Sequence, residues 1–405
     1  MNKKKNLKEI VKQNIGITYV NHQISEMDKL IKLVNYLEET AALKYAIKFQ
    51  KVRINNFFYN RELVGVSGHF KHYSENLYKI EHEDIFLKPM NCPNAFIFLN
   101  KNKPNKYPTQ IHEIGTVFRK ELKSNLNKKN RFSNFTIDDN HTLCKIEYSI
   151  SIIELFIKKV CTFYKIIGID QYNFMLSTKP DKSQGNDTIW EKSEQILKKA
   201  LQINQMEYEI NHGDGSFYAP KIDIRVEGIQ LSTVQLDLFN ADKFDLKNNN
   251  TDQVCIVHHA LTGSIERLYS MNKDKLSFLI KEYTMIMIDC VKDKMNNKYR
   301  LAMEKVNLCF SNFLFNYKHI IVDFSTSVKM HQIVSNNRKK SSIIAFLDFE
   351  NEEFVLHIRT EKSELIDKTF EMWGCNSFLT KEKKITLKNF IYAMLKIKKR
   401  IFDLF

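Results

Sequence analysis

The residues best suited to chemistry lie in one basic block between Ile111 and Cys144, IHEIGTVFRKELKSNLNKKNRFSNFTIDDNHTLC. An apolar run ends at Arg119, a cationic segment follows, and a second apolar run begins after Arg131. We predict a strand, a long cationic loop and an antiparallel return strand, which would let both arginines reach one phosphate-bearing ligand. Guanidinium groups make paired, charge-assisted hydrogen bonds to phosphate, and Phe135 can offer an aromatic face. An ordinary hairpin with solvated charges is the alternative that these residues leave open.

Four further stretches follow the motifs of one family in the same order. They are LKPMNCP at 87–93, LSTKPDKSQGNDTIW at 176–190, FYAPKID at 217–223 with TVQLD at 233–237, and VHHALTGSIER at 257–267. Together with the basic block they resemble class II aminoacyl-tRNA synthetases, specifically threonyl-tRNA synthetases, over roughly residues 45–270. Several collinear motifs carry more weight than any single one. The resemblance implies a threonine–tRNA ligase, which uses ATP to form threonyl-adenylate and then loads the 3′-terminal ribose of tRNA(Thr).

The resemblance also implies a zinc site formed by Cys92, His141 and His258, with one ion per chain. The spacing alone does not suggest a metal, but three N and S ligands leave a fourth position open, as in catalytic zinc sites. The implied fourth ligand is threonine, bound through its amino group and hydroxyl, so that valine is rejected. A buried thiol with two core histidines is the alternative. His259 makes the register ambiguous. Because adjacent strand residues face opposite sides, only one of the two histidines can point at the metal, and we choose His258, the position that the resemblance implies.

Other family positions imply contacts to the amino acid. Asp139 is expected to hold the hydroxyl or amino group of threonine, whereas Asp138 should point away because it precedes Asp139 on a strand. Tyr218, Lys221 and Gln230 match positions near threonine and its activated carboxylate. Lys221 would bring a cation to the carboxylate and the α-phosphate. For Tyr218, simple core packing is the alternative.

The resemblance assigns an ATP site as well, with Mg²⁺ neutralising the polyphosphate. Arg119 is expected at the α-phosphate, Arg131 toward the γ-phosphate, and Arg267 on the other side. The remaining implied contacts are Phe135 stacked on adenine, Glu121 at its amino edge, and Gln235 near the nucleotide or the metal. The first step would be in-line attack of the threonine carboxylate on the α-phosphorus, which depends on positioning and charge stabilisation.

His69, in the stretch SGHF, occupies a position that the family uses near the terminal ribose of tRNA. Because a histidine titrates near neutrality, we expect it to act as a general base in the transfer step. A structural or tRNA-positioning role is the alternative. Arg119, His69 and Lys221 are thus the predicted catalytic residues.

Composition indicates a globular protein with a polyanionic partner. The 405 residues include 62 Lys and Arg against 47 Asp and Glu, a net charge of +15. This charge favours tRNA, although compositional drift in a Lys- and Asn-rich chain is an alternative. No apolar run is long enough to span a membrane. Seven cysteines without a CxxC motif and a start without an apolar signal segment indicate a reducing cytoplasm, and the basic start is also compatible with a mitochondrial address.

Short β-rich runs over residues 46–270, interrupted by helices near 147–166 and 187–202, predict an α+β fold, namely the class II synthetase antiparallel sheet flanked by helices. We expect a basic lead-in and helix at 1–45, a catalytic domain at 46–272, a helical linker at 273–300, and an α/β anticodon-binding-like domain at 301–405. Basic residues of that last domain are RNA contacts or a solvated face: Lys329, Arg338, Lys339, Lys340 and Arg359. A homodimer is expected from the resemblance alone.

Some positions depart from the family pattern. Ile137 replaces a usual glutamine beside the substrate aspartates, and Ser133 and Asn134 replace the usual Arg-Gly before Phe135. These departures keep a non-catalytic tRNA-binding paralogue open as the alternative, beside a class II enzyme of another specificity. Only about 45 residues precede the similarity, too few for a further domain with its own core, so we expect no N-terminal editing domain and measurable misactivation of serine.

Overall fold

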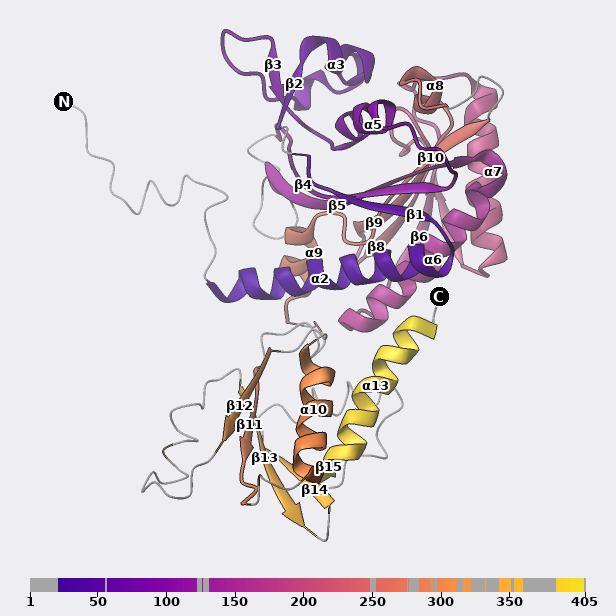
Figure 1. Cartoon of the computed structure of the whole chain (residues 1–405). Coiled ribbons are helices and arrows are strands. Elements are labelled where there is room, and N and C mark those ends of the chain that lie inside the picture. Colours follow the sequence, from indigo (N-terminus) through magenta and orange to yellow (C-terminus); the bar gives the residue numbers. More distant parts are fainter. Residues whose placement is uncertain are drawn as a thin grey trace, which may run out of the picture. The chain divides into compact units, whose positions relative to one another are not determined.

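The computed structural model describes residues 21–54, 57–121, 126, 131–247, 253–274, 276, 284–292, 294, 297–311, 316–321, 332, 342–350, 353–359 and 384–403. The chain divides into two compact units, with a boundary after Asp274. Each unit has its own β-sheet (Figure 1). Among the described helices, none has the length and apolar character needed to cross a membrane.

An eight-stranded sheet organises the first unit, in the order β1-β4-β5-β10-β9-β8-β6-β7. The β1–β4 and β6–β7 pairs are parallel and the other pairs are antiparallel, so the predicted α+β architecture with an antiparallel-dominated sheet is confirmed. The strands are Lys48–Val52 (β1), Thr109–Phe118 (β4), Asn134–Lys145 (β5), Asn173–Ser177 (β6), Tyr208–Asn211 (β7), Lys221–Val226 (β8), Ile229–Asp237 (β9) and Val254–Ala260 (β10).

Helices cover both faces of this sheet. They are Asn21–Lys44 (α2), Cys92–Lys101 (α5), Ser149–Ile167 (α6), Asp187–Ile203 (α7), Asn240–Lys243 (α8) and Ile265–Asn272 (α9). On one face, Glu38 of α2 and Lys159 of α6 contact His259 of β10. On the other face, Phe96 of α5 packs against the rings of His141 and His258. All seven residues of β10 are buried, which explains why its sequence VCIVHHA does not alternate between apolar and exposed polar residues.

The part of the chain between β1 and α5 forms a small subdomain beside the sheet (Figure 1). Its elements are Phe58–Asn60 (β2), Arg61–Val66 (α3), His69–His72 (α4), a 3-10 turn at Ser74–Asn76 (η1), and Ile85–Leu87 (β3). A second 3-10 turn, Ile146–Tyr148 (η2), precedes α6. Tyr59, Val64, Leu77 and Phe86 form the subdomain's own apolar core.

The second unit contains a five-stranded sheet in the order β12-β11-β13-β14-β15. Its elements are Thr284–Asp289 (β11), Asn297–Ser311 (α10), Asn316–Ile321 (β12), Ser342–Glu350 (β13), Glu353–Arg359 (β14), Lys384–Thr386 (β15) and Leu387–Asp403 (α13). The prediction of a helical linker over 273–300 is wrong at β11, which pairs with β12 and β13 as an interior strand. Short apolar runs such as TMIMID fit either periodicity, and pairing on both sides decides for a strand.

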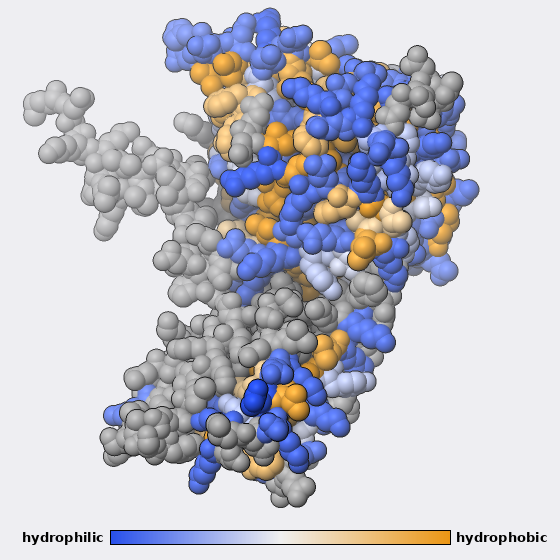
Figure 2. All heavy atoms as spheres, in the orientation of Figure 1, coloured by the Kyte–Doolittle hydropathy of each residue, from blue (hydrophilic) through white to orange (hydrophobic). Residues whose placement is uncertain are grey.

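Figure 2 shows hydrophilic side chains over much of the described surface, with apolar residues in smaller patches between them. The side chains of the five candidate RNA contacts in the C-terminal part lie outside the described residues, as do residues 122–125, 127–130 and 248–252.

Candidate active site

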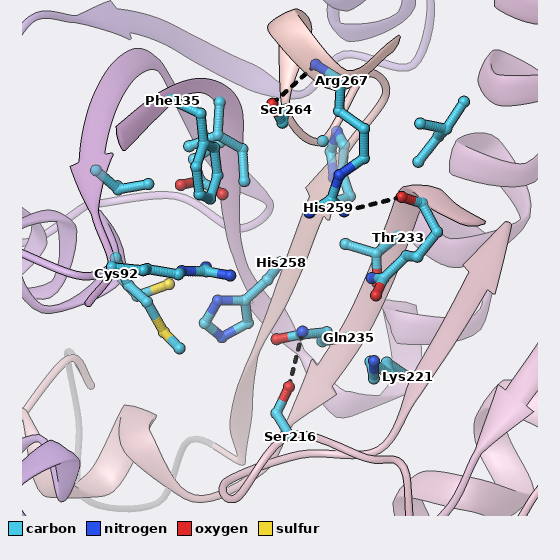
Figure 3. Close-up of a pocket in the computed structure, with 18 of the residues that line it drawn as sticks. Cys92, Phe135, Ser216, Lys221, Thr233, Gln235, His258, His259, Ser264 and Arg267 are labelled. Atoms are coloured by element: carbon cyan, nitrogen blue, oxygen red, sulfur yellow. Dashed lines mark hydrogen bonds between the residues drawn. The ribbon is translucent and has the colours of Figure 1, made fainter. Parts of the chain in front are cut away.

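A pocket in the first unit gathers most of the predicted site residues (Figure 3). Those that line it are Cys92, Arg119, Phe135, Asp139, Tyr218, Lys221, Gln230, Gln235, His258 and Arg267. His141 adjoins the pocket through its contact with His258, the ring centroids being 5.0 Å apart. His69, Glu121 and Arg131 are not among the lining residues. Ile137, where the family usually has glutamine, contributes an apolar wall.

The register of the sheet explains why residues far apart in the sequence meet here. Across neighbouring strands, His141 of β5 pairs with His258 of β10, His258 with Gln235 of β9, and Gln235 with Lys221 of β8. Directly paired residues project from the same face of a sheet. The four side chains therefore form one row along the floor of the site.

Cys92, His141 and His258 form a cluster that could hold a metal ion, because one ligand atom from each lies within 4.8 Å of the others. Both ring nitrogens of His141 are buried, and among the described residues neither has a hydrogen-bond partner. Burial and neighbouring His258 lower the pKa of His141 well below its usual value, so its ring is neutral and can donate a lone pair. The S and N donors and the unsatisfied ring nitrogens fit a zinc ion.

Asp237 orients one member of this cluster, a role that the sequence did not reveal. Its carboxylate lies 3.2 Å from His258 Nε2 and accepts hydrogen bonds from the backbone N–H groups of Phe239 and Asn240, each at 2.8 Å. A carboxylate behind a histidine fixes its ring orientation and tautomer. Asp237 is the last residue of the TVQLD stretch, so the sequence did contain a signal for it. Its contact with His258, however, depends on the register between β9 and β10.

Adjacent strand residues face opposite sides at both positions where the sequence was ambiguous. His259 is buried on the reverse face, where its Nε2 lies 3.1 Å from Glu38 Oε1. Asp138 accepts hydrogen bonds from the backbone of Leu261 and Thr262. Asp139, in contrast, lines the pocket.

Asp139 is held in the pocket by Asn91, whose Nδ2 donates to Oδ2 at 2.7 Å. Gly115 makes room for this contact, because a Cβ there would lie 2.6 Å from Asn91 Oδ1. Burial raises the pKa of Asp139, although Asn91 and nearby cations oppose the rise. The carboxylate is thus positioned to accept hydrogen bonds from a polar substrate group.

Asp223 organises the other end of the row, and sequence reasoning missed it. This fully buried carboxylate pairs with Lys221 Nζ at 2.7 Å and accepts hydrogen bonds from Gln230 Nε2 at 2.7 Å and Thr233 Oγ1 at 3.0 Å. It therefore fixes two predicted substrate-binding side chains. Nearby, Tyr218 donates its hydroxyl to Gln235 Oε1 at 2.6 Å, so Tyr218 has a polar partner in addition to its packing.

Guanidinium groups concentrate positive charge at the pocket wall. Arg119 lies over the ring of Phe135, 5.0 Å from its centroid, and donates to the carbonyl of Pro89. Arg267 donates to the backbone carbonyl of Gln230 at 3.1 Å. Burial, Arg119 and Arg131 together lower the pKa of Arg267 to about 10. Such mutual repulsion between cations is relieved by an anionic ligand.

Glu121 and Arg131 form an ion pair, with Arg131 Nη1 3.0 Å from Glu121 Oε2. Both influence the pKa of Arg267 and so lie near the pocket, although neither lines it. The structure therefore brings these two residues close to the pocket-lining Arg267.

The expectation that His69 titrates near neutrality is wrong. Its side chain is almost completely buried, and burial together with Arg119 and Lys243 lowers its pKa to about 3. Nδ1 lies 2.8 Å from Ser67 Oγ, and the ring packs edge-on against Phe217. The sequence could not show this, because aromatic neighbours and cations reach His69 from other segments. At neutral pH the ring is uncharged and a weak base.

Residues 76–275 match the family of tRNA synthetase class II core domains (G, H, P, S and T). This match, together with the antiparallel-dominated sheet, confirms the resemblance to class II aminoacyl-tRNA synthetases that the motifs indicated. Residues 76–275 are therefore a core domain of this class.

Individual relatives belong to the threonyl branch. The chain is 36% identical over 225 residues to the threonine–tRNA ligase of Natranaerobius thermophilus, and 39% identical over 222 residues to that of Carboxydothermus hydrogenoformans. The matches cover 52% and 51% of this chain but only 35% of each relative. The RNA-binding domain of threonyl-tRNA synthetase from Cryptosporidium parvum Iowa II has the same fold, with a TM-score of 0.63 and 23% identity over 87% of this chain and 92% of that one. The resemblance to threonyl-tRNA synthetases is thus confirmed.

Proposed function

We propose that this protein is a threonine–tRNA ligase. It would activate threonine with ATP to threonyl-adenylate and transfer the threonyl group to the 3′-terminal ribose of tRNA(Thr). The observation that carries the proposal is that Cys92, His141 and His258 cluster beside the same pocket that Asp139 and Arg119 line. The pocket lies in a class II core domain, and the curated relatives named above support threonine as the amino acid.

Cys92, His141 and His258 would hold one zinc ion per chain. When bound, zinc would supply a Lewis acid that takes the amino group and hydroxyl of threonine, and so favour threonine over valine. Asp237 would keep His258 in the orientation that a metal ligand needs, through the 3.2 Å contact with Nε2.

Asp139 would accept a hydrogen bond from the hydroxyl or amino group of threonine, with its other contact held by Asn91. Lys221 and Gln230 share the carboxylate of Asp223 and would contact the threonine carboxylate as it becomes the activated acyl group. Tyr218, hydrogen-bonded to Gln235, would close the pocket beside the amino acid. These residues would position the carboxylate for attack on the α-phosphorus.

The guanidinium groups would bind ATP together with Mg²⁺. Arg119 would hold the α-phosphate and stabilise the charge that develops there, while Arg267 would act from the opposite side. Phe135 would stack on adenine, and Gln235 would lie close to the nucleotide. Glu121 would contact the adenine amino edge while its ion pair directs Arg131 toward the γ-phosphate.

His69 would contribute to the transfer step as a neutral positioning residue. Its pKa of about 3 makes it a poor proton acceptor at neutral pH, and its Nε2, which has no hydrogen-bond partner among the described residues, would be the group that meets a ribose hydroxyl. The resemblance further supports an anticodon-binding role for residues 301–405, a homodimer, and a cytoplasmic location.

The proposal is tested by amino-acid-dependent exchange between ATP and pyrophosphate, measured with threonine, serine, valine and proline. We expect the highest exchange with threonine, weaker exchange with serine because one methyl group is worth only about 1–3 kcal/mol, and none with valine. Cys92→Ser should abolish exchange, whereas the matched control Cys161→Ser on α6 should not. A folded, zinc-loaded protein without exchange for any amino acid would instead favour a non-catalytic tRNA-binding paralogue.

A further inference from the structure

Four basic residues from three separate segments gather next to the pocket. Lys71 and His72 belong to α4, Lys182 to the loop before α7, and Lys243 to α8. The three lysines lie close enough to His72 to lower its pKa together with burial, and Lys243 also acts on His69. None of the four lines the pocket itself. We call Lys71, His72, Lys182 and Lys243 the basic rim.

Packing fixes the segments that carry the basic rim. The ring of His72 is stacked on Phe217, with centroids 5.2 Å apart and an interplanar angle of 6°. Lys243 donates to Gln184 Oε1 at 3.3 Å and lies over the ring of Phe239. Gln184 in turn packs onto Gly68. A Cβ at position 68 would lie 1.6 Å from the side-chain nitrogen Nε2 of Gln184. The loop before α7 and the start of α4 are therefore interlocked.

Two carboxylates near the basic rim are engaged with other lysines. Asp242 forms an ion pair with Lys247 at 2.5 Å, and Asp187 forms one with Lys179. Asp237 also acts on Lys243, but its oxygens hold His258 and two backbone N–H groups. Within the described part of the chain, no ion pair involves the three rim lysines. Three cations around one histidine, none of them in a direct ion pair among the described residues, favour an anionic ligand.

The basic rim leads into the pocket. Phe217, which carries the stacked His72, is followed by Tyr218 in the pocket wall. Between rim and pocket lies His69, whose ring is 5.3 Å from Phe217 and whose Nε2 is buried without a hydrogen-bond partner among the described residues. A polyanion whose end enters the pocket would thus pass its last phosphates over the rim and its terminal sugar past His69.

We propose that the basic rim binds backbone phosphates of the unpaired 3′ end of tRNA and guides its terminal ribose toward the pocket. This inference rests on the proposed function, which supplies the RNA. The rim offers ammonium groups as point charges and a flat ring stack, and no arginine fork. Such groups contact the RNA backbone independently of its sequence. Contacts of this kind suit the unpaired 3′ end, which has to be positioned in the same way in every tRNA molecule that is a substrate.

The test measures RNA binding without catalysis. Fluorescence anisotropy would compare wild type, Lys182→Gln and Lys243→Gln, each with a labelled tRNA(Thr) transcript and with the same transcript lacking its unpaired 3′ nucleotides. The loss of one phosphate contact on a single strand lowers the slope of log binding constant against log salt concentration by about 0.7. A variant that binds as well as wild type at about 1 M salt therefore binds about fivefold more weakly than wild type at about 0.1 M salt. Lys199→Gln, an exposed lysine on α7, is the matched control and should bind as wild type does.

We expect each rim variant to lose about fivefold on the complete transcript and nothing on the truncated one, with threonine-dependent pyrophosphate exchange unchanged. An equal loss on both transcripts, no loss on either, or a loss of exchange would overturn the assignment. The binding assay needs no turnover. If the wild-type protein showed no pyrophosphate exchange, the proposed function would be refuted, but the effect of the rim variants on RNA binding could still be interpreted.

Discussion

Replacing Lys159 by Met should strongly destabilise the first unit, because the change isolates a buried carboxylate. Glu38 of α2 is fully buried. It accepts hydrogen bonds from Lys159 Nζ at 2.6 Å and Gln110 Nε2 at 2.8 Å, and lies 3.1 Å from His259 Nε2. These contacts lie directly behind the strand that carries His258.

The expected magnitude follows from which groups can carry charge. Burial and Lys159 lower the pKa of His259 to about 4, so at pH 7 His259 carries no positive charge and Lys159 is the cation that pairs with Glu38. Removing one partner of a buried ion pair costs about 3–5 kcal/mol, whereas neutralising both partners costs far less. Lys159→Met and Glu38→Gln should each lose roughly that amount, and the double variant only about 1–2 kcal/mol.

The assay is urea unfolding followed by circular dichroism and by tryptophan fluorescence in a Trp373→Phe background, which leaves Trp190, buried in the first unit, as the reporter. Lys51→Met is the control, because the Lys51–Glu39 pair at 3.2 Å is half-exposed and should contribute at most about 1 kcal/mol. The pKa of Glu38 lies below its usual value of 4.5, so its stabilisation is complete above pH 4.5 and declines as the pH falls below it. If the losses of the two single variants simply add in the double variant, the reasoning is refuted.

Three further predictions concern the site. Asp139→Asn should lower kcat/KM for threonine in pyrophosphate exchange by about 10–100-fold, the worth of a charge-assisted hydrogen bond, without a change in the urea midpoint, since Asn91 can still donate to the amide oxygen. His69, with a folded pKa of about 3 against a usual 6.5, takes up a proton only on unfolding, so stability should fall as the pH drops below about 6.5; His69→Gln should flatten that fall in a pH series of urea midpoints. Dialysis against a strong chelator should remove zinc and exchange together, and Cys92→Ser should retain less zinc than Cys161→Ser in a metal assay.

Much of the site could be predicted because its residues lie in motifs that follow the family's order, and strand alternation then indicated which face each residue occupies. For the pairs His258/His259 and Asp138/Asp139, the rule that adjacent strand residues face opposite sides left one residue of each pair for the site, and the family's motif positions indicated His258 and Asp139. His259 and Asp138 do face away from the pocket, where His259 contacts Glu38 and Asp138 accepts hydrogen bonds from the backbone of Leu261 and Thr262.

Other features depend on which segments meet, and the sequence does not contain that information locally. Asp223 and Asp237 acquire their roles only through strand register, which places them beside Lys221 and His258. The low pKa of His69 arises from burial and from cations of other segments. Likewise, Lys159 reaches His259 from a helix about a hundred residues away, and β11 became recognisable only through its two partner strands.

The most direct test of a zinc-dependent threonine site is reconstitution of the metal-free protein with measured amounts of zinc, followed by pyrophosphate exchange with threonine and with valine. Threonine-dependent exchange should rise in proportion to bound zinc and saturate at about one ion per chain, with valine inactive throughout. Exchange that is independent of zinc, or that accepts valine as well as threonine, would contradict the assignment of Cys92, His141 and His258.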